Sequence, residues 1–259
     1  MKSHCLYLIA VVLFMPGRVD ADVWDQATVN DNAFDTTHNQ LVHATRQVHD
    51  LGAQPGPVSD ADWYVVSLPA YSSFEVIVDG LTGDINPFVQ RYASDGTTLV
   101  QSATSVTNSF SRRLAWANTT GAFVTSYIRV GQASCGSTCT ASDQYTISSH
   151  ETTIAVARFN NSGSQITVLL TQNASHVAVN ATFFYWSTTG VLLSTGTLPG
   201  FAANHLNVFN TSTFAALQGV GGHITIAHDG PYGSLNVKSV ALEPSTGFSF
   251  DTPGVYKGR

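Results

Sequence analysis

Acidic side chains in the first quarter of the sequence could collect a metal ion. Asp25, Asp31 and Asp35 follow one another closely, and Asp60 and Asp62 stand just before a Trp-Tyr pair. Carboxylates are the hard ligands that Ca²⁺ takes, and neighbouring loops could supply the roughly six to eight oxygens it needs. Carboxylates before a strand also cap turns by accepting backbone N–H bonds, and the spacing here is not that of an EF-hand. We expect the capping role and no resident cofactor, with calcium as the alternative.

Large aromatic side chains are the second group that could bind a ligand. An exposed aromatic ring offers a sugar or a peptide a large apolar contact at a small entropy cost. Trp63 and Trp116 lie in alternating, strand-like runs, so we expect both in a core. Trp186 and Tyr232 each lie close to a turn. These two residues are therefore the candidates for an exposed binding platform.

The motifs of two common hydrolase classes are absent from the sequence. No Gly-x-Ser-x-Gly segment is present, and His150-Glu151 has no second His four residues on, so neither a serine nucleophile elbow nor a zinc HExxH motif forms. A pair of carboxylates such as Glu75 and Asp84 would serve a glycosidase only if the fold brought them together. We assign no catalytic residue and expect a protein that is not an enzyme.

The N-terminal residues 1–21 have the pattern of a cleaved secretory signal peptide. Lys2 precedes an apolar run from Cys5 to Met15, and Val19 and Ala21 occupy the −3 and −1 positions of a cleavage site. The apolar run is too short to span a bilayer comfortably. We therefore expect a secreted protein, extracellular or periplasmic, with no membrane insertion after cleavage.

Two cysteines remain beyond that segment, and they are close together. Cys135 and Cys139 fall in the stretch ASCGSTCTASD. An even pair at short spacing in an exported protein favours a disulfide. Because the loop it closes is tiny, the bond would contribute only about 1–2 kcal/mol, enough to hold a loop but not a domain.

Composition narrows the class of protein and of partner. The 259-residue chain carries 11 Lys and Arg against 17 Asp and Glu, a net charge of −6. A basic face that could neutralise several phosphates cannot be assembled from so few cations, so we expect no nucleic-acid partner. Charged residues make up only 11% of the chain, which is typical of an exported β-protein. The length suits two all-β domains of roughly 100 to 130 residues each, at residues 22–150 and 151–259.

Alternating segments separated by turn signals predict an all-β chain with two antiparallel β-sandwich domains, jelly-roll-like or immunoglobulin-like. In the stretch from Asp60 to Gly80, Trp63, Val65 and Ser67 share one strand face while Tyr64, Val66 and Leu68 share the other. The following run at residues 74–78 predicts a hairpin with this strand. Further strands are expected at residues 87–92, 98–100, 144–148, 154–159, 166–172, 177–186 and 191–197.

Short motifs in residues 22–150 resemble the bacterial pre-peptidase C-terminal domain. The motifs are Asn30, Asp31 and Phe34, Asp62-Trp63-Tyr64 running into Leu68-Pro69-Ala70, Gly83-Asp84, Asp95-Gly96-Thr97 with Leu99, Tyr127-Ile128-Arg129-Val130 and Tyr145-Thr146-Ile147. The resemblance implies a jelly-roll-like sandwich that is not itself catalytic, that accompanies secreted enzymes, and that in some members binds substrate polymers or calcium. The cysteine-bearing loop departs from the family pattern.

The second half resembles immunoglobulin-like secreted modules only in general pattern. Asn-x-Ser/Thr sequons occur at Asn118, Asn160, Asn173, Asn180 and Asn210, and they would be glycan sites in a eukaryotic host. Taken together, these features predict a secreted, non-catalytic binding or cell-envelope module whose partner is an extracellular polysaccharide or protein. A structural subunit of a surface assembly is the alternative, and a secreted hydrolase, or an accessory module of one, is the third.

Overall fold

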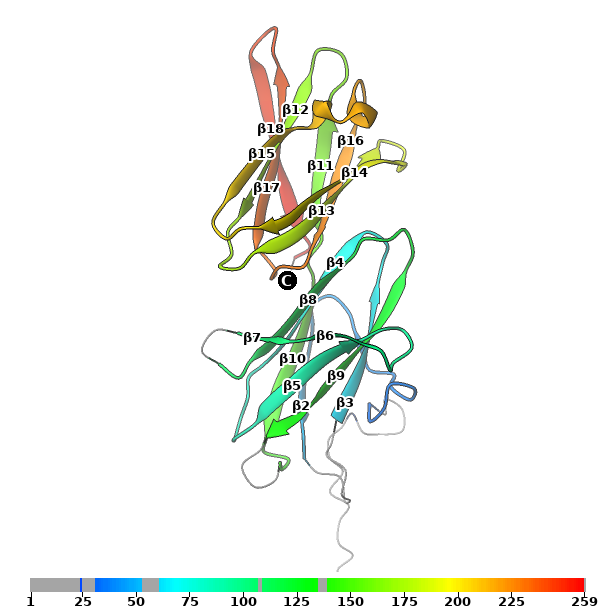
Figure 1. Ribbon diagram of the computed structural model, residues 1–259, viewed down its shortest axis with the longest axis vertical. Helices are drawn as coiled ribbons and strands as arrows, with labels where there is room; N and C mark the ends of the chain where they lie inside the picture. The colour runs from blue at the N-terminus through cyan, green and yellow to red at the C-terminus, as the bar shows by residue number, and fades with distance from the viewer. Residues whose placement is uncertain (1–23, 25–30, 53–60, 107–108, 135–138, 259) are drawn as a thin grey trace, which may run out of the picture.

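The fold is all-β, as the alternating segments predict. The computed structural model describes residues 24, 31–52, 61–106, 109–134 and 139–258. Figure 1 shows two β-sandwiches stacked end to end along the long axis of the molecule, with the C-terminus at the junction between them. Among the described residues, no helix is long and apolar enough to cross a membrane.

The first sandwich consists of two five-stranded sheets. In spatial order, one sheet contains β1 (Gln40–Leu41), β3 (Ala61–Leu68), β9 (Val124–Ser134), β5 (Asn86–Tyr92) and β6 (Leu99–Ser102). The other contains β2 (Thr45–Asp50), β10 (Gln144–Glu151), β4 (Ser72–Asp79), β8 (Arg112–Asn118) and β7 (Thr104–Ser105). Only the short β1–β3 pair is parallel among the described pairs.

The predicted hairpin between β3 and β4 is wrong. β3 pairs with β1 and β9, whereas β4 pairs with β8 and β10 in the opposite sheet. The connection Pro69–Tyr71 crosses from one layer to the other, with Tyr71 in the left-handed region at φ 58°. Strand alternation alone cannot distinguish these arrangements, because both leave the same faces buried.

Tyr64, Val66 and Leu68 fill the first core, and each is fully buried. The Tyr64 hydroxyl of β3 lies 2.6 Å from the Tyr145 hydroxyl of β10, so one hydrogen bond joins the two sheets through the core. The other face of β3 carries Trp63, which is only half-buried. The expectation that Trp63 fills the core is therefore wrong, while Trp116 is buried as expected.

The second sandwich is one continuous series of eight strands folded on itself. In spatial order these are β14 (Leu192–Phe201), β13 (Val179–Ser187), β16 (Gly221–His228), β11 (Ile154–Asn160), β18 (Phe248–Tyr256), β17 (Leu235–Glu243), β12 (Ile166–Asn173) and β15 (Leu206–Asn210). Two 3-10 turns, η1 (Thr211–Thr213) and η2 (Ala215–Leu217), follow β15.

Strand β18 joins the two layers of this sandwich. Its first part pairs with β17 and its end pairs with β11, and Pro253-Gly254 lies where the partner changes. A Cβ on Gly254 would lie 2.9 Å from the Ile154 side chain and 3.0 Å from that of Val237. A glycine is therefore needed for the layers to approach this closely, as is common where a strand switches sheets.

The two sandwiches are joined by Thr152 and Thr153, which are held against β4. The backbone N–H of Thr152 donates to the Ser73 carbonyl at 2.9 Å, and the Thr152 hydroxyl bonds to the Ser73 hydroxyl at the same distance. The Ser73 N–H in turn donates to the Thr153 hydroxyl at 3.0 Å. Because both joining residues are hydrogen-bonded to the first sandwich, the sandwiches meet through a short, tethered connection.

Candidate functional site

The outer face of the second sandwich, next to the junction, carries an aromatic platform. In β13, Phe183 and Tyr185 point into the core, while Phe184 and Trp186 point outward. Phe184 is nevertheless only 1% exposed, because Tyr71 of the first sandwich packs over it with ring centroids 4.8 Å apart. Tyr71 also meets Trp186 edge to face at 5.2 Å. The first sandwich thus covers one end of the platform and leaves Trp186 half-exposed.

Hydrogen bonding and stacking hold Trp186 in place. Its indole N–H donates to the Thr225 hydroxyl of β16 at 2.9 Å. Its ring lies nearly parallel to that of His223, the residue opposite it in the β13–β16 pair, with centroids 6.2 Å apart. A Cβ on Gly222 would lie 1.7 Å from the Trp186 carbonyl oxygen, so only glycine fits beside it. A ring held this way is prepared for a ligand and would lose little entropy on binding.

A groove runs from this platform along β16. Its first hollow, of about 410 Å³, lies between the Pro69–Ser72 turn and the sheet, with Trp186, His223 and Thr225 on the sheet side and Glu151 at the rim. The second hollow, of about 510 Å³, shares His223 and continues over the meeting point of β11 and β16. Both volumes are within the range of small-ligand sites.

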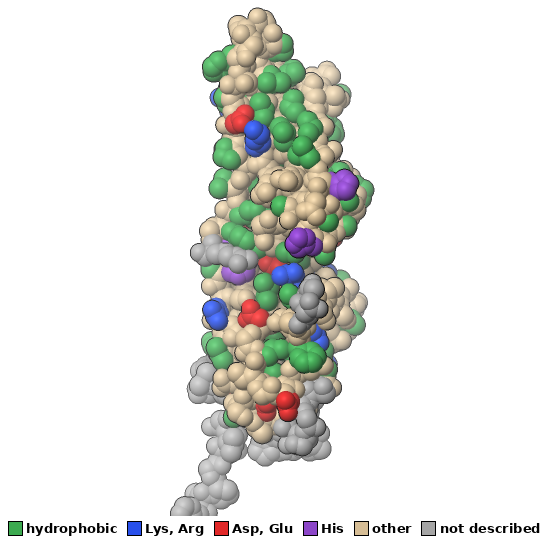
Figure 2. Space-filling view, turned by 90° about the vertical axis from the view of Figure 1, so that its left-hand side faces the viewer, with side chains coloured by type: hydrophobic (Ala, Val, Ile, Leu, Met, Phe, Trp, Pro, Cys, Tyr) green, Lys and Arg blue, Asp and Glu red, His purple; other side chains and the backbone are tan. Residues whose placement is uncertain are grey.

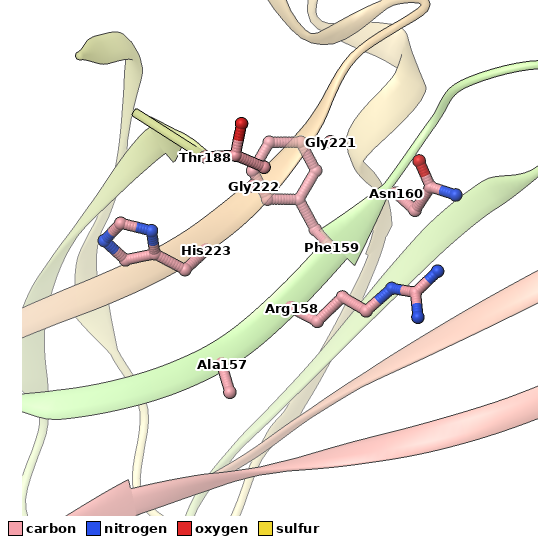
Figure 3. A pocket seen from close by; sticks show the side chains of 8 residues that line it. All are labelled: Ala157, Arg158, Phe159, Asn160, Thr188, Gly221, Gly222 and His223. Atoms are coloured by element: carbon pink, nitrogen blue, oxygen red, sulfur yellow. The ribbon is translucent and has the colours of Figure 1, made fainter. Parts of the chain in front are cut away.

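The second hollow is shown in Figure 3. Thr188 and His223 lie toward one end, Gly221 and Gly222 add no side chain to the lining, and the Arg158 side chain extends away from His223 on the side of Asn160. Figure 2 shows a face of the molecule on which uncharged polar and apolar atoms predominate and charged side chains are sparse. The side chains that line the two hollows can make apolar stacking contacts and neutral hydrogen bonds, with Glu151, Arg158 and His223 as the ionisable groups.

The structure places Tyr232 in the domain junction, not beside Trp186. Its backbone N–H donates to Glu75 Oε2 at 3.1 Å, and its hydroxyl donates to the Lys257 carbonyl at 2.6 Å. Its ring packs against Tyr256 at 4.8 Å and His150 at 5.7 Å. Tyr232 thus contributes to contact between the sandwiches, and of the two residues predicted to form an exposed platform only Trp186 lines the groove.

Buried ionisable groups surround this junction. His228 is fully buried, and burial lowers its pKa to about 4. Its Nδ1 accepts the Gly230 N–H at 3.2 Å, and its Nε2 lies 3.3 Å from the Tyr256 hydroxyl. Burial raises the pKa of Tyr256 to about 12. The neutral imidazole and neutral phenol are therefore the forms that this packing favours.

The predicted acidic cluster is divided by the fold. Asp31 and Asp62 converge with His49 so that one potential ligand atom from each lies within 4.8 Å of the others, and all three residues are buried. Asp35 is exposed and takes no part in this group. Asp25 and Asp60 lie outside the described residues.

Among the described residues, the donor set does not fit calcium. One carboxylate oxygen of Asp62 already accepts a short hydrogen bond from the Tyr145 hydroxyl. Asp31 Oδ2 accepts from the Asn39 amide at 3.4 Å and lies 3.6 Å from His49 Nδ1. An imidazole is not a ligand that Ca²⁺ prefers, and two carboxylates are far from the roughly six to eight oxygens it takes. The three residues belong to a hydrogen-bonded network in the first core, and the calcium alternative, which also includes Asp25 and Asp60, stays a hypothesis.

Two of the sequons occupy buried positions. Asn173 is fully buried, and its amide donates to the carbonyls of Val177 and Phe201 at 2.8 Å. Asn118 is 5% exposed and donates to the Pro69 and Ala122 carbonyls at 2.8 Å. A glycan cannot be attached to an amide nitrogen that is buried and engaged in this way. Asn180, in contrast, is exposed.

The sequon pattern has a structural explanation. At Asn118, Asn160, Asn173 and Asn210, the side-chain oxygen accepts both the backbone N–H and the hydroxyl of the Ser or Thr two residues on. Each of these Asn residues is the last residue of its strand. The repeated Asn-x-Ser/Thr motif is thus a turn that ends strands, in which a short side chain satisfies the backbone.

Only one of the two cysteines of the predicted disulfide lies in the described part of the chain. Cys139 is buried against the first core, and Cys135 lies outside the described residues. The pairing stays a prediction, as does the signal peptide at residues 1–21, which also lies outside the described part of the chain.

No family model matches the chain, and no curated protein is similar to it. Among solved structures, the pre-peptidase C-terminal domain of a collagenase from Bacillus anthracis matches 43% of this chain and 92% of its own, with 15% identity and a TM-score of 0.32. This match bears the name of the family that residues 22–150 resemble.

Two other solved structures match a larger part of the chain. The extracellular region of zebrafish Gpr126/Adgrg6 matches 85% of this chain and 33% of its own, with 10% identity and a TM-score of 0.23. A β-glucuronidase of glycoside hydrolase family 2 matches 79% and 25%, with 9% identity and a TM-score of 0.21. At these TM-scores, none of the matches bears on what the groove binds.

Proposed function

We propose that the protein is a secreted, non-catalytic module that binds an extracellular polysaccharide in the groove at the domain junction. The observation that carries the proposal is the half-exposed Trp186 ring, which is fixed by Thr225 and His223 beside an open groove. The apolar face of a sugar ring packs well on an indole, and a polymer can continue along a groove where a globular protein surface cannot follow.

The chemistry of the lining supports a sugar as the ligand. The hydroxyl groups of Thr153 and Thr225 line the first hollow beside the aromatic side chains, and the exposed Thr188 adds a hydroxyl to the second. These side chains can both donate and accept hydrogen bonds, which matches the hydroxyl groups of a sugar. Specificity in such sites comes from a small number of polar groups around apolar contacts.

A binding role is favoured over hydrolysis because the described lining of the groove lacks a pair of carboxylates. Glycosidases use a pair of carboxylic acids that flank the bond to be cleaved. Among the described lining residues of the two hollows, Glu151 is the one carboxylate, and it is bonded to Lys257 at 3.0 Å. Glu75, which the sequence offered as half of an acidic pair, is buried and bonded to Arg113 at 2.7 Å.

The test measures binding of the protein to a panel of soluble polysaccharides by affinity electrophoresis and calorimetry. Trp186→Ala should weaken binding at least about tenfold, equivalent to about 1.4 kcal/mol. Phe123→Ala is the matched control, because Phe123 is a 62% exposed aromatic residue of the first sandwich.

Two results would contradict the proposal. The first is absence of the expected effect, either because no polysaccharide binds or because Trp186→Ala binds as tightly as the wild type and Phe123→Ala do. The other is release of reducing ends from a bound polymer, since this would show an enzyme. Quenching of tryptophan fluorescence by the ligand, lost in Trp186→Ala, would support the assigned position.

A further inference from the structure

Strand β11 contains a β-bulge at the floor of the groove. Val156 is opposite Ile224 and Phe159 is opposite Gly222, so Ala157 and Arg158 together oppose the single residue His223. A bulge inserts one extra residue into a strand and changes the direction of the side chains around it, and bulges are frequent next to binding sites.

The bulge determines on which side of the sheet Arg158 lies. Ile154 and Val156 point into the core, so an unbroken alternation would send Arg158 there as well. With the extra residue, Arg158 is exposed and Phe159 takes the core position. The Ser239 hydroxyl donates to the Arg158 carbonyl at 2.6 Å and holds the bulged backbone. The bulge therefore places this cation on the outer face of the sheet, where it lines the groove.

Arg158 also differs from the other cations of its sandwich. Lys238 is bonded to Asp251 at 2.6 Å, and Lys257 to Glu151 at 3.0 Å. Arg158 forms no ion pair with any residue that the structure describes. Its guanidinium instead lies over the Phe250 ring, 4.6 Å from the centroid. Stacking occupies one face of the planar group and leaves its N–H edges available.

We infer that the groove takes an acidic polysaccharide, with a carboxylate or sulfate group of the polymer bound by Arg158 while a sugar ring packs on Trp186. The inference rests on the proposed function and adds the charge of the ligand to it. A guanidinium presents N–H donors in a fork that matches the two oxygens of a carboxylate, and it also binds sulfate oxygens. Since the whole chain has a net charge of −6, attraction of a polyanion requires a local cation, and among the described lining residues of the two hollows Arg158 is the one Lys or Arg.

The experiment compares one polymer with and without its charge. Polygalacturonate is measured against highly methyl-esterified pectin, which has the same backbone with its carboxylates neutralised, and a sulfated galactan is measured against unsulfated galactan. Wild-type protein should bind the acidic member of at least one pair about tenfold or more tightly, with an affinity that falls as salt is raised. The pair that shows the preference identifies carboxylate or sulfate as the group.

Variants of Arg158 test whether this residue causes the preference for the acidic polymer. Arg158→Gln should remove the preference for the acidic polymer, so that its ratio of affinities for the charged and uncharged members falls to about one, and Arg158→Lys should restore part of the preference. Arg46→Gln is the control, because Arg46 is an exposed arginine in the first sandwich. Equal binding of charged and uncharged polymers by the wild type, or an acidic preference that survives Arg158→Gln, would overturn the inference and leave the proposed function standing. Failure of every polymer to bind would overturn both.

Discussion

Glu75 of the first sandwich accepts a hydrogen bond from the backbone N–H of Tyr232 in the second, at 3.1 Å. The carboxylate is 1% exposed, and its other oxygen is bonded to Arg113 at 2.7 Å. A buried charge of one sandwich thus holds a loop of the other. The same junction forms one wall of the groove, since Tyr71 reaches across it to Phe184 and Trp186. Contacts that join the sandwiches therefore also shape the proposed binding site.

Replacing Glu75 by Gln should destabilise the protein by about 2 kcal/mol. The substitution removes the charge that pairs with Arg113, and the loss is moderated because the Arg113 side chain is 31% exposed to water. Unfolding in urea measures the change. Glu243→Gln is the control, because Glu243 is a partly exposed residue whose carboxylate is hydrogen-bonded to Ser245 and Ser164 and forms no ion pair with any residue that the structure describes. If the two variants were equally stable, Glu75 would not be a structural contact.

Replacing Asn173 by Ala should cost about 3 kcal/mol or more. Its amide donates to the Val177 and Phe201 carbonyls and its oxygen accepts from Ser175, so the substitution leaves several buried polar groups without partners. Asn173→Asp should also destabilise, because both donated bonds are lost. The exposed Asn180 provides the comparison, and Asn180→Ala should cost less than about 1 kcal/mol. Thermal and urea unfolding distinguish the two, and a similar loss at both positions would contradict the strand-end role of Asn173.

Trp63→Ala should be milder than Trp116→Ala. Trp63 lies on the outer face of β3, where it packs against Phe34, Tyr92 and the Arg129 guanidinium. We expect a cost of about 1–2 kcal/mol for Trp63, since only part of its surface is removed from water. Trp116 is 5% exposed, and truncating it should cost about 3–5 kcal/mol because a cavity remains. If urea unfolding showed the same loss of unfolding free energy for both variants, Trp63 would have to be a core residue.

Acid should destabilise the protein in part through His228. Burial lowers its pKa from the ordinary 6.5 to about 4. Between these two values the unfolded chain binds a proton that the folded chain does not, so stability rises with pH across this window. The contribution is complete above pH 6.5 and is lost as the pH falls toward 4, with a total of about 3 kcal/mol.

The His228→Asn variant isolates this effect. An Asn carbonyl can still accept the Gly230 N–H, but it does not titrate. The loss of unfolding free energy between pH 7 and pH 4.5 should be smaller in the variant than in the wild type. If both proteins lost the same amount, the acid sensitivity would have to arise from other groups.

The sequence by itself determined the all-β class and the approximate position of most strands, because side-chain alternation and turn residues act over a few neighbouring positions. It also showed which residues of β3 share a face. It could not show which face was inside, since Trp63 and Val65 are as apolar as Tyr64 and Val66. The sequence also could not show with which strands β4 pairs, because a hairpin and a crossing between sheets leave the same residues buried.

The candidate site was decided by the tertiary structure. Tyr71, Trp186 and His223 come from distant segments, and only the docking of the two sandwiches brings Tyr71 over Phe184. Arg158 reaches the groove because of a bulge whose register depends on pairing with β16. Alternation read from the sequence would place this side chain in the core. Local patterns determine which strands form, whereas a site built from several strands depends on pairings between residues far apart in the chain, and no short-range signal carries that information.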